Sequence, residues 1–141
     1  MKKNKFISLV LCAAMVLPAL SMSGCTDKQS SEEKPFADSV DILISIDYPQ
    51  RSELEDVKNE VFTIEEKSSV LEVIQLYCNV NEMPVTIETT GGVVVGINDL
   101  LNGDIFAART WQFKVNGEFS DKPADEIMLK DGDSLEWVYL K

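Results

Sequence analysis

The sequence predicts an α+β domain in which a mostly antiparallel β-sheet packs on a single α-helix. Apolar residues alternate with polar ones through Val40–Tyr48 and again through Trp111–Val115, as in half-buried strands, and Ser134–Leu140 is expected to be a last strand. Between these segments, Val70–Cys78 carries apolar residues at helical spacing. A helix and a sheet that each have one apolar face exclude water by packing on each other. The order of hairpin, helix and further strands indicates a β-grasp-like fold.

The first hairpin is indicated by two apolar segments with charged residues between them. Every second residue of Val40–Tyr48 is apolar, so we expect one face of this strand to be buried. Pro49 and the charged residues that follow it are typical of a turn. The segment Glu60–Ile64 is then expected to be a shorter partner strand.

The helix has a clear start signal. Ser69 and Glu72 fit a capping box, in which each side chain bonds the backbone of the other residue. We expect the helix to run to about Val80, because Asn and Glu residues and then Pro84 follow it. Cys78 falls on its apolar face and is expected to be buried and unreactive.

Turn signals divide the second half of the chain. A Gly-Gly pair predicts a hairpin between Pro84–Thr89 and Val93–Ile97, and Asn116–Gly117 predicts another tight turn. Asn98–Arg109 is expected to be a loop, long enough to be functional. Lys130–Asp133 has only part of a calcium-loop pattern and is interpreted as a turn.

The first residues of the chain are typical of an export signal. A basic start, Met1–Lys5, precedes the apolar run Phe6–Leu20, which is shorter than the ~20 residues of a membrane span. The following Met22–Cys25 resembles the lipobox of bacterial lipoproteins. That resemblance implies that residues 1–24 are removed and that the Cys25 sulfur carries a diacylglycerol.

This organisation predicts where the protein is located. Residues 25–38 are polar and are expected to be a disordered tether between the lipid on Cys25 and a domain at residues 39–141. We therefore expect a lipid-anchored protein on the extracytoplasmic face of the bacterial membrane. The net charge of −11 becomes more negative once Lys2, Lys3 and Lys5 leave with the leader. Such acidity excludes nucleic acid as a partner, since phosphates need Lys and Arg.

The residue types also restrict the chemistry. The chain contains no histidine, which removes Ser-His and Cys-His nucleophile pairs and all His-ligated metal sites. We therefore expect no enzyme, no metal site and no catalytic cofactor.

Four segments in a fixed order carry a resemblance to a known family. They are "SVLEVIQLY", "VVVGINDL", "WQFKVNG" and "LKDGDSLEWVY". Together they resemble the transcobalamin C-terminal-like domain, known in bacteria as a domain of unknown function, over about Val40–Tyr139. The resemblance implies a β-grasp fold. In animal transcobalamin and intrinsic factor, the related domain closes over one face of a corrinoid beside a helical barrel, so cobalamin is the bound ligand that the resemblance implies.

Five residues are candidates for binding such a ligand. Trp111 and Trp137, together with Phe113 and Tyr139, lie on strands expected to be neighbours and could form an aromatic platform; the alternative is that all four pack in the core. Asn98, Phe106 and Arg109 belong to the long loop, and Arg109 could meet a carboxylate or phosphate of the ligand. The alternative for Arg109 is a surface ion pair with one of the two loop aspartates, Asp99 or Asp104.

Two functions remain open from the sequence. The first is a lipid-anchored binding module without catalysis, for a corrinoid or a similar small cofactor. The second is an adaptor that docks to another surface protein or transporter subunit and takes no small molecule.

Overall fold

A mixed five-stranded sheet with one α-helix across it is the main feature of the structure, a computed structural model that describes residues 38–140. The expected leader, the lipidated Cys25 and all but the last residue of the tether lie outside the described residues. No helix of the described part is both long and apolar enough to cross a membrane.

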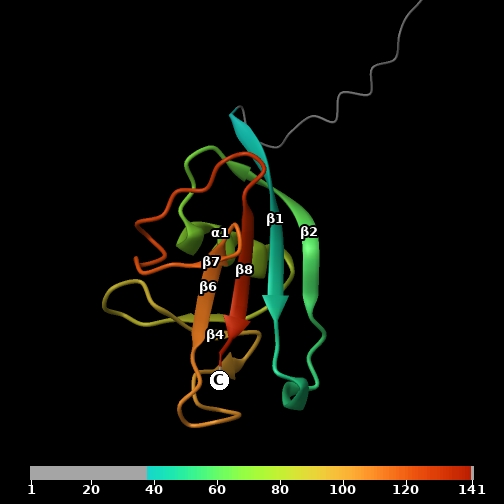
Figure 1. The fold of residues 1–141 in the computed structure, drawn as a ribbon, viewed down its shortest axis with the longest axis vertical. Coiled ribbons are helices and arrows are strands. Elements are labelled where there is room, and N and C mark those ends of the chain that lie inside the picture. Colours follow the sequence, from blue (N-terminus) through green and yellow to red (C-terminus); the bar gives the residue numbers. More distant parts are fainter. Residues whose placement is uncertain (1–37, 141) are drawn as a thin grey trace, which may run out of the picture. The chain divides into compact units, whose positions relative to one another are not determined.

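The five-stranded sheet has its first and last strands side by side at the centre. Its strand order is β2 (Val57–Glu65), β1 (Ser39–Asp47), β8 (Ser134–Tyr139), β6 (Trp111–Val115) and β7 (Glu118–Phe119). β1 and β8 are parallel, and the other pairs are antiparallel. The arrowheads of β1 and β8 therefore point the same way (Figure 1).

A second, three-stranded sheet lies between the helix and β6 in the chain. It consists of β3 (Val85–Ile87), β4 (Val94–Ile97) and β5 (Leu100–Leu101), all antiparallel. Asn98 and Asp99 connect β4 to β5 with φ of 54° and 62°, the geometry of a two-residue hairpin turn. The prediction of one continuous loop over Asn98–Arg109 was therefore wrong at its start. A strand of two residues leaves no detectable alternation in the sequence.

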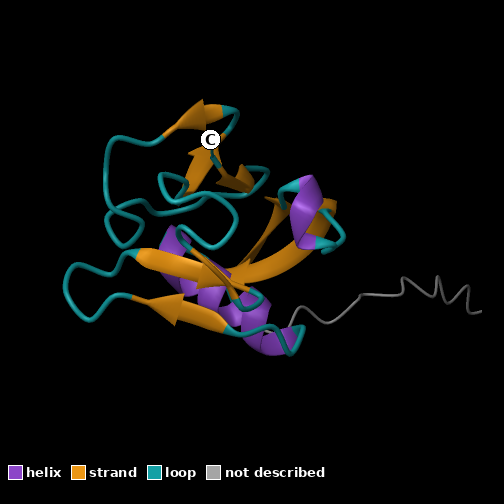
Figure 2. Ribbon diagram, turned by 90° about the horizontal axis from the view of Figure 1, so that it is seen from below, coloured by secondary structure: helices purple, strands orange, loops and turns teal. Residues whose placement is uncertain are grey.

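The helix α1 (Val70–Val80) begins as the sequence predicts. Glu72 N donates to Ser69 Oγ over 3.2 Å, and Ser69 N donates to Glu72 Oε2 over 2.7 Å, which completes the capping box. The helix lies across one face of the five-stranded sheet (Figure 2). Tyr77 Oη donates to Glu60 Oε2 over 2.7 Å and so joins the helix to the edge strand β2.

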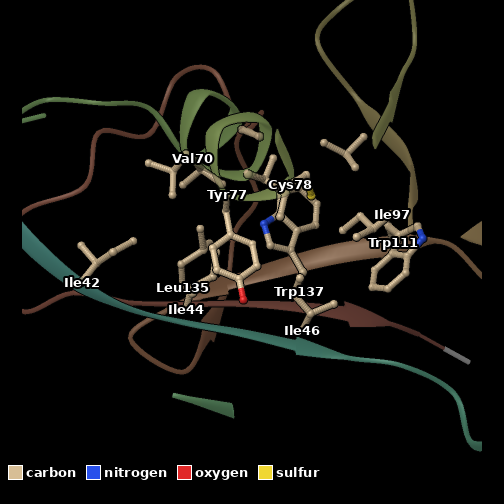
Figure 3. Close-up of a cluster of buried hydrophobic side chains, with 14 of the residues drawn as sticks. Ile42, Ile44, Ile46, Val70, Tyr77, Cys78, Ile97, Trp111, Leu135 and Trp137 are labelled. Carbon is tan, nitrogen blue, oxygen red and sulfur yellow. The ribbon is translucent and has the colours of Figure 1, made fainter. Parts of the chain in front are cut away.

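The core lies between α1 and the sheet. Ile42, Ile44 and Ile46 project from β1 toward the helix, and all three are fully buried. Figure 3 shows Trp137 of β8 between the strands and the helix, near the helical residues Tyr77 and Cys78. Cys78 is buried and has no disulfide partner among the described residues, and burial raises the pKa of its thiol to about 11. The prediction that Cys78 is buried is confirmed, and its low reactivity stays a prediction.

The α+β class predicted from the sequence is confirmed, with differences in detail. β2 starts at Val57 instead of Glu60. The pairing register shifts between Ile44 and Ile46, and Asn59 has a φ of 48°, so a bulge interrupts the alternation there. The sequence pattern shows only the regular half of that strand. The expected single sheet is in fact two.

Ser69→Ala is expected to lower the free energy of unfolding by about 1 kcal/mol, the usual effect of losing an N-cap side chain. Bonds from the backbone and side chain of Ser69 hold the pKa of Glu72 below its usual 4.5. A carboxyl pKa that is lower in the folded protein than in the unfolded chain stabilises the fold at pH values above the unfolded pKa. The part of the lost stability that acts through Glu72 should therefore disappear as acid protonates this residue. Urea unfolding at neutral and acidic pH measures both effects. Ser68→Ala is the control, and an equal loss in that variant would contradict the capping role.

Candidate functional site

An open groove of about 440 Å³ lies where β1 and β8 end. Its lining comes from two loops and from the last residues of β1 and β8, and consists of Asp47–Arg51, Phe106, Arg109 and Tyr139. Because β1 and β8 run parallel, their carboxyl ends lie at the same edge of the sheet (Figure 1). We call this feature the Phe106 groove. Its volume falls within the ~300–1,000 Å³ that small-molecule sites occupy.

The loop after β1 places Arg51 at the groove. A short 3₁₀ turn, η1 (Gln50–Ser52), follows Pro49, and Ser52 N and Ser52 Oγ both donate to Pro49 O, over 2.8 and 2.7 Å. Tyr48 N donates to Asp56 Oδ1 over 3.0 Å, which ties the start of the loop to its end. The backbone that carries Arg51 is therefore held by hydrogen bonds on both sides.

The loop before β6 places Phe106 and Arg109. Leu101 N donates to Asp104 Oδ2 over 2.7 Å, and Tyr139 Oη donates to Leu101 O over 3.0 Å. Arg109 N donates to Phe106 O over 2.9 Å, which closes a turn with both side chains on it. Phe106 remains 38% exposed, so its ring is presented at the surface on a well-tied loop.

Both arginines of the chain meet at Phe106. The sequence contains only two arginines, and they are 58 positions apart. The guanidinium carbon of Arg51 lies 5.1 Å from the centre of the Phe106 ring, and that of Arg109 lies 3.9 Å from it. Both distances are within the ~6 Å at which a cation and an aromatic face attract each other. An exposed ring with two cations over it is the most distinctive feature of the groove.

Buried aromatic residues support the groove from below. The Trp111 ring makes edge-to-face contacts with Tyr48 and with Tyr139, at centroid distances of 5.6 and 5.3 Å. Trp111 Nε1 donates to Leu100 O over 2.8 Å, so its polar atom is satisfied. Burial raises the pKa of Tyr48 to about 12, and a hydrogen bond with Asn98 opposes that rise. Tyr48 therefore stays neutral, and together with Trp111 and Tyr139 it forms an aromatic floor for the groove.

A second, smaller hollow of about 190 Å³ lies between the β6–β7 hairpin, the Gly91–Gly92 turn and the segment Pro123–Ala124. Trp111 and Trp137 contribute to its lining but are only 5% and 2% exposed. Trp137 Nε1 has no hydrogen-bond partner among the described residues. The rings offer too little surface there to stack on a large flat ligand, so we regard the Phe106 groove as the better candidate.

The structure separates the five residues that the sequence proposed. Phe106 and Arg109 line the groove, and Asn98 lies beneath it beside Tyr48. Trp111 and Trp137 are buried, in keeping with the core-packing alternative.

Two groove residues, Arg51 and Tyr48, are not predicted from the sequence, whereas Tyr139 belongs to the expected aromatic platform and does line the groove. Tyr48 continues the apolar alternation of its strand, so nothing in the sequence sets it apart. Arg51 has one signal that could have been used, because it is the only other arginine of the chain.

The ion-pair alternative for Arg109 finds no support in the structure. The salt bridges of residues 38–140 are Lys58 with Asp56 and Lys114 with Glu136, and neither includes Arg109. In the same region, no three carboxylate or thiol side chains are grouped as metal ligands would be. Asp131 and Asp133 instead accept hydrogen bonds within and around their turn, from Asp41 N and Lys130 N.

Two solved structures share this fold at low sequence identity. Haptocorrin in complex with Cbi matches with a TM-score of 0.61 and 16% identity, over 75% of this chain and 26% of that chain. A candidate metal-binding protein from Ruminococcus gnavus matches with a TM-score of 0.51 and 16% identity, over 72% of this chain and 97% of that chain. The chain thus corresponds to about a quarter of haptocorrin and to nearly all of the second protein.

No curated protein matches the chain in sequence. A family model described as a domain of unknown function, DUF4430, matches residues 67–141, from just before α1 to the end of the chain. Because this match covers more than half of its length, the chain belongs to the DUF4430 family.

Proposed function

We propose that this protein is a binding module without catalysis, held at the extracytoplasmic membrane surface by lipid on Cys25, and that it takes a flat small ligand at the Phe106 groove. The exposed Phe106 ring with both arginines over it carries the proposal. The exposed ring and the guanidiniums over it together offer a surface on which a flat molecule can stack, and the floor of Tyr48, Trp111 and Tyr139 supports that surface.

A corrinoid is the ligand class that we propose. The family resemblance over Val40–Tyr139 points to it, and so does the shared fold with a haptocorrin crystallised with Cbi, a corrinoid. The groove is open to solvent on one side and covers only part of a corrin, whereas tight sites bury ~70–90% of their ligand. We therefore expect affinity in the micromolar range.

We also assign the domain to the β-grasp type. Three features support this: the β1–β2 hairpin leads into α1, the last strand β8 lies parallel to β1, and β6 and β7 complete the other half of the sheet. The groove lies at the end of this sheet where β1 and β8 finish.

Cobalamin is expected to bind the full chain, purified in detergent, in equilibrium dialysis. Phe106→Ala should weaken binding about tenfold or more, since a stacking contact with its desolvated area is worth about 1.4 kcal/mol at least. Phe119→Ala is a matched control: Phe119 is also exposed, and it also lies under a cation, Lys114 Nζ, at 4.9 Å, but on β7. This control should leave the affinity unchanged.

The absence of cobalamin binding at high micromolar concentration would reject the corrinoid. If the full chain then captured one stoichiometric protein from its own membrane, the adaptor alternative would replace the small-molecule proposal. Equal weakening by Phe106→Ala and Phe119→Ala would show that the ligand sits elsewhere.

The lipid anchor is tested separately. A clickable palmitate analogue supplied to cells that express the chain should label the protein. The labelled protein should stay with the membrane fraction. Cys25→Ala should lose the label and release the protein, because the thioether is the expected point of attachment. Cys12→Ala is the control and should keep both. Labelling that survives Cys25→Ala would contradict the anchor without affecting the groove.

A further inference from the structure

The guanidinium groups of both arginines lie over the Phe106 ring, and neither group donates a hydrogen bond to another residue of the described part of the chain. Over an aromatic ring, a guanidinium is attracted through its face, while its five N–H donors lie in the plane of the group. Neither Arg51 nor Arg109 is among the side chains that donate hydrogen bonds within residues 38–140. Asp47 also lines the groove, yet neither arginine forms a salt bridge with it. Up to ten charged donors therefore lie around one ring without a hydrogen-bond acceptor among residues 38–140.

The separation of the two guanidiniums suits a single acceptor. The guanidinium carbons of Arg51 and Arg109 lie 5.1 and 3.9 Å from the centre of the same ring. The sum of these two distances is therefore the upper limit on the distance between the two carbons. An oxyanion that accepts hydrogen bonds of ~2.9 Å from both groups spans a gap of this size. Arginine forks match phosphate and carboxylate groups in geometry as well as charge.

The rest of the chain makes this spot exceptional. The protein is strongly acidic, with a net charge of −11, and its only two arginines both lie at this groove. Two like charges on one ring repel each other, and an anion between them removes that repulsion. The backbone ties of both loops hold the arginine backbones in place without a ligand, so little ordering is needed on binding.

We infer that Arg51 and Arg109 together bind one oxyanion, a phosphate or a carboxylate, carried by the ligand that stacks on Phe106. The inference rests on the proposed function for the ligand's flat part, and it adds an acidic group at a fixed distance from that part. A ligand with a ring and a phosphodiester or carboxylate fits both features. A neutral ring of the same size uses only one of them.

The chain offers a direct test because it has only two arginines. Labelling with ¹⁵N-arginine gives two Nε–H signals in an NMR spectrum of the full chain in a neutral detergent. Inorganic phosphate and acetate should shift both signals along one saturable curve with a common Kd. Chloride at the same ionic strength should not. A separate titration uses dihexanoyl phosphatidylglycerol. A lower Kd for this lipid than for phosphate would identify a lipid headgroup as the source of the oxyanion.

Variants separate hydrogen bonding from charge. Arg51→Lys and Arg109→Lys keep the charge but lose the fork, and each should weaken phosphate binding about tenfold. Phe106→Leu removes the ring that gathers the arginines and should weaken it as well, whereas Phe119→Leu should not.

A response of one signal only, no response to either oxyanion, or equal shifts with chloride would overturn the inference. The dialysis experiment keeps the two proposals apart. Cobalamin binding, combined with arginine signals that do not shift with phosphate or acetate, would reject the oxyanion site and leave the binding module standing. Phosphate binding without cobalamin binding would reject the corrinoid and leave the oxyanion site standing.

Discussion

The parallel pairing of β1 with β8 holds the rest of the domain together. β1 is the first described strand and β8 the last, and they form the middle of the five-stranded sheet. Their inward side chains, among them Ile44, Ile46 and Trp137, are buried beneath α1. The other strands are then added on either side, β2 beside β1 and β6 beside β8. The core therefore forms only when the two ends of the domain meet, a contact between segments distant in sequence.

The same pairing creates the groove. Two parallel neighbours end at the same edge, so the loop after β1 and the end of β8 come together there. Tyr139 at the end of β8 bonds the loop that carries Phe106, and Trp111 fills the space behind. A rigid support of this kind lowers the ordering that a ligand would otherwise have to impose on surface loops. In an acidic protein, the only two arginines are thereby concentrated where a ring is exposed.

The sequence predicts the locally encoded parts of this structure well. The alternation of Val40–Tyr48 gives β1 and its buried face, and the pair Ser69 and Glu72 gives the start of α1. Local patterns fail where the determining contact is distant. The pairing of β1 with β8 has no local signature. The short strand β5 is formed by its hydrogen bonds to β4 rather than by its own two residues.

The candidate site is harder to predict for the same reason. Phe106 and Arg109 were found because they share one long loop, but Arg51 reaches them through the fold. An aromatic residue that alternates along a strand, such as Trp111, has the same pattern whether it packs in the core or faces a ligand. Only burial distinguishes these cases, and here it favours packing.

Hydrogen exchange of the full chain, measured with and without cobalamin, tests most directly whether a rigid frame presents a ligand site at its edge. We expect the ligand to slow exchange in two segments, residues 48–56 and 98–110. The amides of β1, β8 and α1 should exchange slowly in both states. Protection that appears elsewhere while these two segments stay unchanged, or fast exchange throughout the central strands, would contradict this expectation.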